Sequence, residues 1–178
     1  MFRNLFSFSD EKKSAHRLYI ILVEQARQPA FYLNCGVADT VAGRFDMVIL
    51  HAILLLRRMH REPEKTGPLS QALFDYMFDD FDLNLREIGI GDTGIGKRIK
   101  KMGTGFYGRL EAYGQGLDSD DDTLLHAALA RNLYREMQPS DQEISSVANY
   151  MRRESAALEK IDLDSVMAGN FNFGDAPT

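Results

Sequence analysis

The sequence predicts an all-α fold, a single-domain bundle of about six or more helices. Apolar residues recur at helical spacing along most of the chain, and no segment alternates apolar and polar residues as a half-buried strand would. No Asn-Gly or Asp-Gly pair is present to form a tight hairpin turn. With 178 residues, of which 44% are hydrophobic, the chain can bury a core without a metal or a disulfide, and Cys35 has no second cysteine to pair with.

The first expected helix spans residues 9–26, within a helical domain that we place at residues 9–160. Ser9 is a suitable N-cap, acidic residues follow it, and Pro29 lies just beyond the expected end. The apolar face of this helix is formed by Ala15, Leu18, Tyr19, Leu22 and Ala26. Residues 1–8 form a short apolar segment that lacks the long apolar core and the cleavage site of a secretory signal.

Residues 40–60 are expected to form a helix that is apolar on nearly every face, and such a helix belongs in the middle of a fold. Its longest apolar run, 47–56, is too short for a membrane span. A loop is expected over residues 62–68, where two prolines and a glycine interrupt the pattern, and a third long helix over residues 69–88. The apolar stripe of that third helix is formed by Phe74, Phe78, Phe81, Leu85 and Ile88.

Two more helices are expected toward the C-terminus. Residues 124–137 carry a helical apolar pattern, and the three acids at 120–122 stand where they complement the helix dipole. Ser140 and Glu143 form a capping box at the start of the next helix. Beyond that helix the pattern fades, so residues 161–178 are expected to be a flexible C-terminal tail.

Nine of the 14 glycines fall between Gly89 and Gly116. They include two strings that are found in phosphate-binding loops, G-x-G-x-x-G at 89–94 and G-x-x-x-x-G-K at 91–97. Either string needs a preceding strand, whereas a helix is expected here, and a P-loop also needs Ser or Thr where this chain has Arg98. The sequence therefore predicts a turn between two helices and no nucleotide site.

A basic helix is expected directly after this turn. At about 100° per residue, its apolar side chains return to one face and its lysines fall on the other. The apolar face is formed by Ile95, Ile99, Met102, Phe106, Leu110 and Tyr113. Gly103, Gly105 and Gly108 lie inside this helix, and each costs about 0.8–1 kcal/mol relative to alanine. Three explanations stay open, namely the close approach of a ligand or another backbone, a pliable helix, and a tight internal helix crossing.

The positive charges of this helix are the one basic concentration in an acidic chain. The formal net charge of −5 argues against a whole-surface nucleic-acid binder and against DNA as a partner. The cluster is either a solvated face or a local site for RNA, anionic lipid headgroups or an acidic protein surface. Neighbouring aromatic residues could stack on bases, but their spacing is equally typical of a core. The cluster consists of Lys97, Arg98, Lys100, Lys101 and Arg109, and its aromatic neighbours are Phe106 and Tyr107.

Residues suited to catalysis or metal binding are scattered along the chain. The four histidines form no H-x-x-x-H pair, and a lone cysteine does not supply a zinc ligand set. The acids Asp75, Asp79, Asp80 and Asp82 fit a solubilising helix face better than a metal site. We therefore expect no catalytic, cofactor-binding or metal-binding residues, and no enzymatic activity.

Several blocks of sequence, in order along residues 35–150, carry a resemblance to a known family. The blocks are FDMVILHA (45–52), LSQALFD (69–75), FDLNLREIGIGD (81–92), KRIKKM (97–102), FYGR (106–109) and AY (112–113). Together they resemble the ubiquinol–cytochrome c chaperone family. In that family the glycine-rich segment joins two helices and binds no nucleotide.

The resemblance implies a helical, non-enzymatic chaperone without cofactors that binds newly made cytochrome b and promotes assembly of the cytochrome bc1 complex, respiratory complex III. Its expected partners are unassembled cytochrome b, other complex III components and, as for mitochondrial members, the ribosome. The chain lacks the long N-terminal extension of a mitochondrial import precursor. A bacterial member is therefore expected, in the cytoplasm and peripherally at the cytoplasmic face of the inner membrane. The alternative is an RNA- or ribosome-associated binding module that uses the basic helix 97–109.

A water-soluble factor for such a client needs an apolar groove that accepts a client helix. The candidates for this groove are Phe74, Phe78, Phe81, Met102, Phe106 and Tyr107. A basic face could orient the protein at anionic lipid or at acidic client loops, and its candidates are Lys97, Arg98, Lys100, Lys101 and Arg109.

Overall fold

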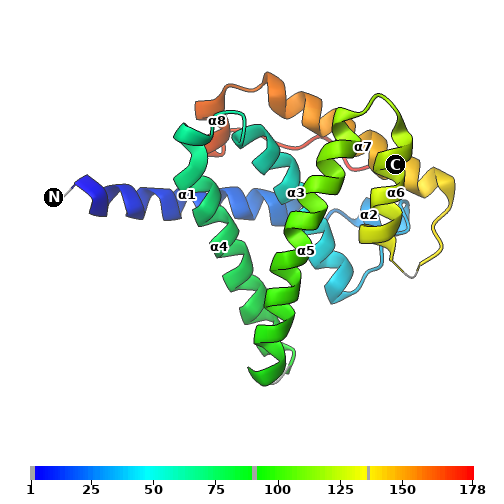
Figure 1. Ribbon diagram of the computed structural model, residues 1–178, viewed down its shortest axis with the longest axis horizontal. Helices are drawn as coiled ribbons and strands as arrows, with labels where there is room; N and C mark the ends of the chain where they lie inside the picture. Colours follow the sequence, from blue (N-terminus) through cyan, green and yellow to red (C-terminus); the bar gives the residue numbers. More distant parts are fainter. Residues whose placement is uncertain (1–2, 90–91, 136) are drawn as a thin grey trace.

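The computed structural model describes residues 3–89, 92–135 and 137–178. In this part of the chain there are eight α-helices, one π-helical segment and no strand, so the predicted all-α fold is confirmed (Figure 1). The elements are α1 (Arg3–Ala26), α2 (Pro29–Leu33), α3 (Val41–Met59), α4 (Pro63–Glu87), α5 (Asp92–Asp118), α6 (Asp122–Leu129), the π-helical segment η1 (Ala130–Tyr134), α7 (Asp141–Lys160) and α8 (Leu163–Ala168).

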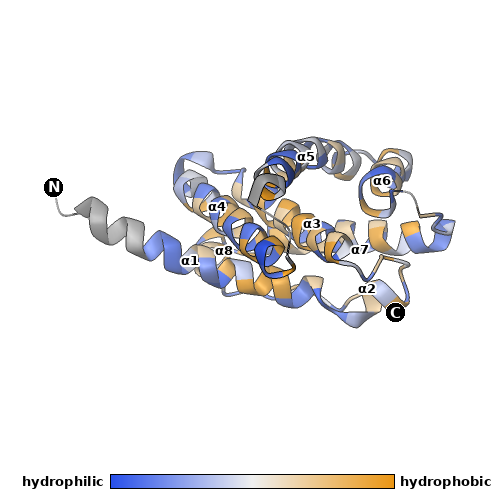
Figure 2. Cartoon of the chain, turned by 90° about the horizontal axis from the view of Figure 1, so that it is seen from below, coloured by the Kyte–Doolittle hydropathy of each residue, from blue (hydrophilic) through white to orange (hydrophobic). Residues whose placement is uncertain are grey.

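Helix α3 lies in the middle of the bundle, as its sequence predicts. It contacts α1, α4, α5 and α7, and Figure 2 shows it between α1 and α5. The helix begins after Thr40, whose side chain accepts a hydrogen bond from the backbone N–H of Gly43. Every residue from Asp46 to Leu55 is buried, so the central helix organises the core around itself.

Helices α1 and α4 both begin earlier than expected. Helix α1 starts at Arg3 and continues through Ser9, because no glycine or proline in this stretch ends it and a mid-helix serine costs little. Helix α4 starts at Pro63, so the loop expected over residues 62–68 is corrected. Proline suits the first helical position, and the Thr66 hydroxyl donates to the carbonyl of Met59 across the short connection.

Helices α4 and α5 form an antiparallel pair whose joined ends project from the rest of the molecule (Figure 1). Gly89, just after the end of α4, has a φ of +83°, in the left-handed region that favours glycine. The glycine strings therefore follow a helix and not a strand, which rules out the structural context of a P-loop. Ile90 and Gly91, in the middle of this turn, lie outside the described residues, as do Met1 and Phe2 of the apolar segment 1–8.

The helix expected over residues 124–137 is shorter and less regular than its pattern suggests. Asp121 caps the N-terminus of α6, and the α-helical part ends at Leu129. The chain continues as the π-helical segment η1, after which Arg135 adopts a φ of +53°. The predicted capping box is confirmed, because Ser140 and Glu143 each bond to the backbone N–H of the other at the start of α7.

The C-terminal segment differs from the flexible tail expected over residues 161–178. It forms α8, which contacts α1, and then returns along the bundle. Val166 and Phe171 are buried, and the ring of Phe173 meets the edge of the His51 ring at a centroid distance of 5.0 Å. These few apolar side chains were too widely spaced to give a helical pattern, yet they pack into the core.

No helix in the described residues combines the length and the hydropathy that a bilayer span needs.

Candidate functional site

Helix α5 presents its two faces as the sequence predicts. Ile95, Phe106 and Tyr113 are buried against the bundle. The four basic residues of its first half are exposed, namely Lys97, Arg98, Lys100 and Lys101. The fifth basic candidate behaves differently, because only 12% of the Arg109 side chain is exposed and its guanidinium lies 3.1 Å from the carboxylate of Asp46. Arg109 is therefore part of an internal ion pair and not of the solvated basic face.

The six apolar candidates divide between the core and the surface. Phe78, Phe81 and Phe106 are buried, and their rings form a continuous aromatic cluster with Phe74 and Phe45. Phe78 and Phe81 line neither of the two clefts described below, whereas Phe106, although only 1% exposed, lies in the wall of the first. The residues that reach the surface are Tyr107, which is 59% exposed, and the half-buried Phe74 and Met102.

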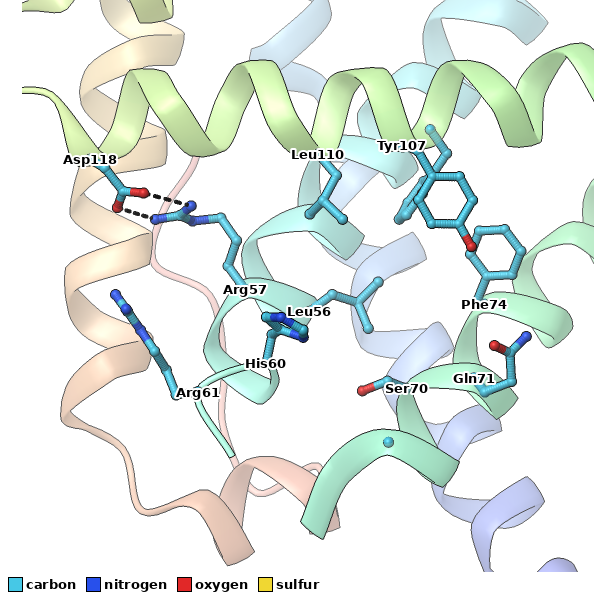
Figure 3. A pocket seen from close by; sticks show the side chains of 12 residues that line it. Leu56, Arg57, His60, Arg61, Ser70, Gln71, Phe74, Tyr107, Leu110 and Asp118 are labelled. Atoms are coloured by element: carbon cyan, nitrogen blue, oxygen red, sulfur yellow. Dashed lines mark hydrogen bonds and ion pairs between the residues drawn. The ribbon is translucent and has the colours of Figure 1, made fainter. Parts of the chain in front are cut away.

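A first cleft, of about 670 Å³, lies between the C-terminal end of α3, the first half of α4 and α5. Figure 3 shows the rings of Phe74 and Tyr107 facing each other at one end, with Leu56 and Leu110 between the helices. The ring centroids of Phe74 and Tyr107 are 5.7 Å apart. This end of the cleft is apolar and open, which suits a side chain of an apolar partner.

The other end of the first cleft is polar. Arg57 donates to Asp118 at 2.7 Å, and this hydrogen bond lowers the pKa of the Asp118 carboxyl (Figure 3). His60 and Arg61 stand beside this pair. The sequence predicted Phe74, Phe106 and Tyr107 in this region but not the α3 residues, because a helix that is apolar all round gives no sign of which residues line a cleft.

A second cleft, of about 860 Å³, lies on another side of α5, against the N-terminal end of α3, the C-terminal end of α4 and η1. Its apolar lining includes Phe45, Ile49, Leu85, Ile88 and Met102. Five cationic side chains and one carboxylate complete the wall, namely Arg98, Lys101, Arg109, Arg131, Arg135 and Asp46. Positive charge therefore exceeds negative charge in a cleft that belongs to an acidic protein.

Asp46 holds two of these arginines in place. Its carboxylate lies 3.1 Å from Arg109 and 2.7 Å from Arg135. Burial raises the pKa of Asp46, and both guanidinium groups oppose that shift. Arg135 reaches the carboxylate from a strained backbone conformation directly after the π-helical segment, and π-bulges and strained residues gather at functional sites.

The glycines of α5 do not share one role. A Cβ at Gly116 would lie 2.7 Å from the Cα of Leu125, so a tight crossing with α6 explains this glycine. At Gly96 and Gly108 a Cβ would meet nothing within 4 Å, and at Gly103 it would only touch Phe78 at 4.0 Å. A tight internal crossing is therefore excluded for Gly96, Gly103 and Gly108, where close ligand approach or pliability remains. At Gly105 a Cβ would lie 2.8 Å from the guanidinium of Arg109, which belongs to the same helix.

Two further titratable groups, His51 and Cys35, are buried in the core. His51 is fully buried, its Nδ1–H donates to the Met47 carbonyl at 2.8 Å, and its Nε2 accepts from the Tyr150 hydroxyl at 2.8 Å. Burial raises the pKa of the Cys35 thiol to about 11, so this thiol stays protonated at neutral pH. Among the described residues no three His, Cys, Asp or Glu side chains lie together as a metal site.

Residues 33–173 match the family model of the ubiquinol-cytochrome C chaperone. The chain belongs to this family. The predicted resemblance is thereby confirmed, and the family match covers both clefts.

Curated relatives and a solved structure agree with this assignment. Ubiquinol-cytochrome c reductase complex assembly factor 1 of Mus musculus is 25% identical over 88% of this chain, and protein CBP3, mitochondrial, of Saccharomyces cerevisiae is 29% identical over 80%. The chain spans 52% of the mouse protein and 44% of the yeast protein. The crystal structure of the Cbp3 homolog from Brucella abortus is 36% identical, with a TM-score of 0.84 over 99% of this chain and 98% of that one. The Brucella match fits the expected bacterial member.

Proposed function

We propose that this protein is a non-enzymatic chaperone that binds newly made cytochrome b and promotes assembly of the cytochrome bc1 complex. The observation that carries the proposal is the family match over residues 33–173. The name of the mouse relative, an assembly factor of the ubiquinol-cytochrome c reductase complex, supports the same process. The protein would act in the cytoplasm, peripherally at the inner membrane, where its client is inserted.

The first cleft is the part of the structure that best fits a segment of such a client. Its apolar end combines the exposed ring of Tyr107 with Phe74, Leu56 and Leu110. An amphipathic or apolar client helix could place one or two side chains between these residues, in the manner of helix-in-groove recognition. The polar end, with His60 and Arg61, would meet the solvated flank of the same segment.

Crosslinking in cells tests this assignment. A photoreactive residue at Tyr107 is expected to give an adduct with cytochrome b, and the same residue at Leu33, which is 81% exposed on α2, is the matched control and should give none. Tyr107→Ala should reduce the amount of captured cytochrome b by about tenfold. Aromatic anchors at the centre of an interface commonly contribute about 1.4 kcal/mol or more, which corresponds to a tenfold change in affinity. Equal crosslinking from Tyr107 and Leu33 would contradict the first cleft as the binding site of the client.

Deletion of the gene tests the process itself. Assembled complex III should fall while the cytochrome b transcript is unchanged, because the defect lies after translation. Unchanged levels of the complex would contradict the proposed function. The alternative use of the basic helix as an RNA- or ribosome-binding surface predicts instead an affinity that falls steeply with salt and depends on Lys97, Lys100 and Lys101.

A further inference from the structure

The second cleft has a charge pattern that the proposed client site does not explain. Two of its cations, Arg98 and Lys101, come from α5, whereas Arg131 comes from η1 and Arg135 directly follows it. Among the described residues, the side chains of Arg98, Lys101 and Arg131 make no salt bridge or hydrogen bond. Cations that come from two different elements of one cleft, with arginine predominant, are suited to a phosphate or carboxylate group.

The floor and the rim of this cleft are apolar. Phe45, Ile49 and Leu85 line the cleft and are buried or half-buried, so we call them its floor. At the rim, Val41 is 42% exposed and Ile88 is 54% exposed, so two aliphatic side chains border the mouth of the cleft. A ligand that satisfies the whole cleft therefore needs an anionic head and an apolar body.

One wall of the cleft is formed by glycine. Gly105 and Gly108 line it from α5, and Gly108 faces open space, since a Cβ there would meet nothing within 4 Å. A glycine inside a helix costs about 1 kcal/mol relative to alanine. No helix crossing explains this cost at Gly108, whereas space for a bound group does.

We propose that the second cleft binds one anionic phospholipid at the surface of a bilayer. The phosphate lies between Arg98 and Lys101 of α5 and Arg131 of η1, and the upper part of the acyl chains covers the apolar floor. The exposed rim residues Val41 and Ile88 then enter the interface between headgroups and acyl chains, where cations and aliphatic side chains together favour binding. A free phosphate would leave that rim in water, so the rim favours a lipid.

The proposal does not depend on the identity of the client, because it concerns another cleft and is tested with the purified protein alone. Cosedimentation with vesicles measures it. The protein is expected to bind phosphatidylcholine vesicles that contain phosphatidylglycerol at least about tenfold more tightly than vesicles of phosphatidylcholine alone, since each basic residue near an anionic surface contributes about 1 kcal/mol.

Two pairs of substitutions separate the cleft from diffuse attraction. The double variant Arg98→Ala, Lys101→Ala removes two cations that line the cleft. The double variant Lys97→Ala, Lys100→Ala removes two exposed cations of the same helix that do not line the cleft. Both variants have the same net charge. The first pair should lose about tenfold in affinity for phosphatidylglycerol vesicles and the second pair less than about threefold. Equal losses would overturn the cleft as the site.

Gly108→Leu tests the shape of the cleft without changing its charge. The new side chain grows into open space from an exposed helix position, so the variant should fold and melt no lower than the wild type. Binding to phosphatidylglycerol vesicles should fall by about tenfold. Unchanged binding by this variant would overturn the proposal.

Two further outcomes would assign the second cleft to another ligand and overturn the proposal that it binds a phospholipid. Release from the vesicles by soluble glycerol phosphate, at the same molar concentration as the accessible lipid, would indicate a soluble phosphate ligand. The cleft would be a peptide site if phosphatidylglycerol did not increase vesicle binding by the wild type and if the Gly108→Leu variant no longer bound cytochrome b. In either case the tests at Tyr107 still decide the proposed function separately.

Discussion

Two parts of α5 use glycine for opposite purposes. Near the C-terminal end, a Cβ at Gly114 would lie 2.9 Å from the Arg57 guanidinium, and one at Gly116 would collide with the backbone of Leu125. Glycine there lets α5 pack closely against α3 and α6. Earlier in the helix, Gly96 and Gly108 face open space, so glycine there leaves room or freedom instead of closing a contact.

This difference divides the molecule into a closed side and an open side. On the closed side, α3, α6, α7 and the end of α5 pack together, and α3 and α7 contribute the buried His51 and Tyr150. On the open side, residues 92–110 of α5 pack against α4, and both clefts border this part of the helix. Stability should therefore depend on the closed side and binding on the open side, and three substitutions test that division.

The largest effect is expected at His51, on the closed side. Burial lowers its pKa to about 4, against an ordinary value of 6.5, so the folded protein holds a neutral ring while the unfolded chain takes up a proton. A depressed pKa of this kind contributes stability that is present above pH about 6.5 and is lost as the pH falls toward about 4. The loss amounts to about 3 kcal/mol of unfolding free energy.

Urea unfolding of the wild type and of His51→Gln at a series of pH values measures this effect. The difference between the two proteins isolates the histidine, because the carboxylates titrate in both. The stability of the wild type should fall more steeply than that of the variant over this pH range. Parallel pH profiles would show that the buried ring does not set the acid limit of the fold.

The second effect concerns the close crossing of α5 and α6. A methyl group at Gly116 would lie 2.7 Å from the Cα of Leu125 and 2.9 Å from its backbone nitrogen, and neither atom can move without shifting the helix. Gly116→Ala should therefore lower the free energy of unfolding by about 2 kcal/mol, even though alanine favours the helix. A variant as stable as the wild type would contradict a tight closed side.

The sequence predicts the helices well and the surfaces poorly. Helical periodicity locates α3, α5 and α7, and the capping box at Ser140 gives the start of α7 to the residue. The predicted loop over residues 62–68 is wrong because a proline at the first position of a helix has the same local sequence as a proline in a turn. The π-helical segment has no periodic signal that differs from an α-helix over five residues.

Site prediction fails where tertiary contacts decide exposure. Phe74 and Phe78 share one stripe of α4, yet Phe74 reaches the first cleft and Phe78 is buried beneath α5. Arg109 belongs to the same basic run as Lys101, but Asp46, more than sixty residues away along the chain, draws it inside. No local pattern carries information of this kind, because the first cleft forms between three elements and the second between four.

The smallest effect, at Gly108 on the open side, decides what glycine does at this position. Gly108→Ala adds a methyl group that meets nothing within 4 Å, so the free energy of unfolding should rise by about 1 kcal/mol, opposite in sign to Gly116→Ala.

Vesicle binding by the same variant gives the second readout. If Gly108 serves to leave space, the small side chain of alanine should preserve vesicle binding, whereas Gly108→Leu should lose it. If Gly108 serves to keep the helix pliable, alanine alone should already weaken binding, since it stiffens the helix without filling the cleft. Thermal melting and vesicle cosedimentation of the two variants side by side therefore separate space from flexibility, the two explanations that the sequence leaves open.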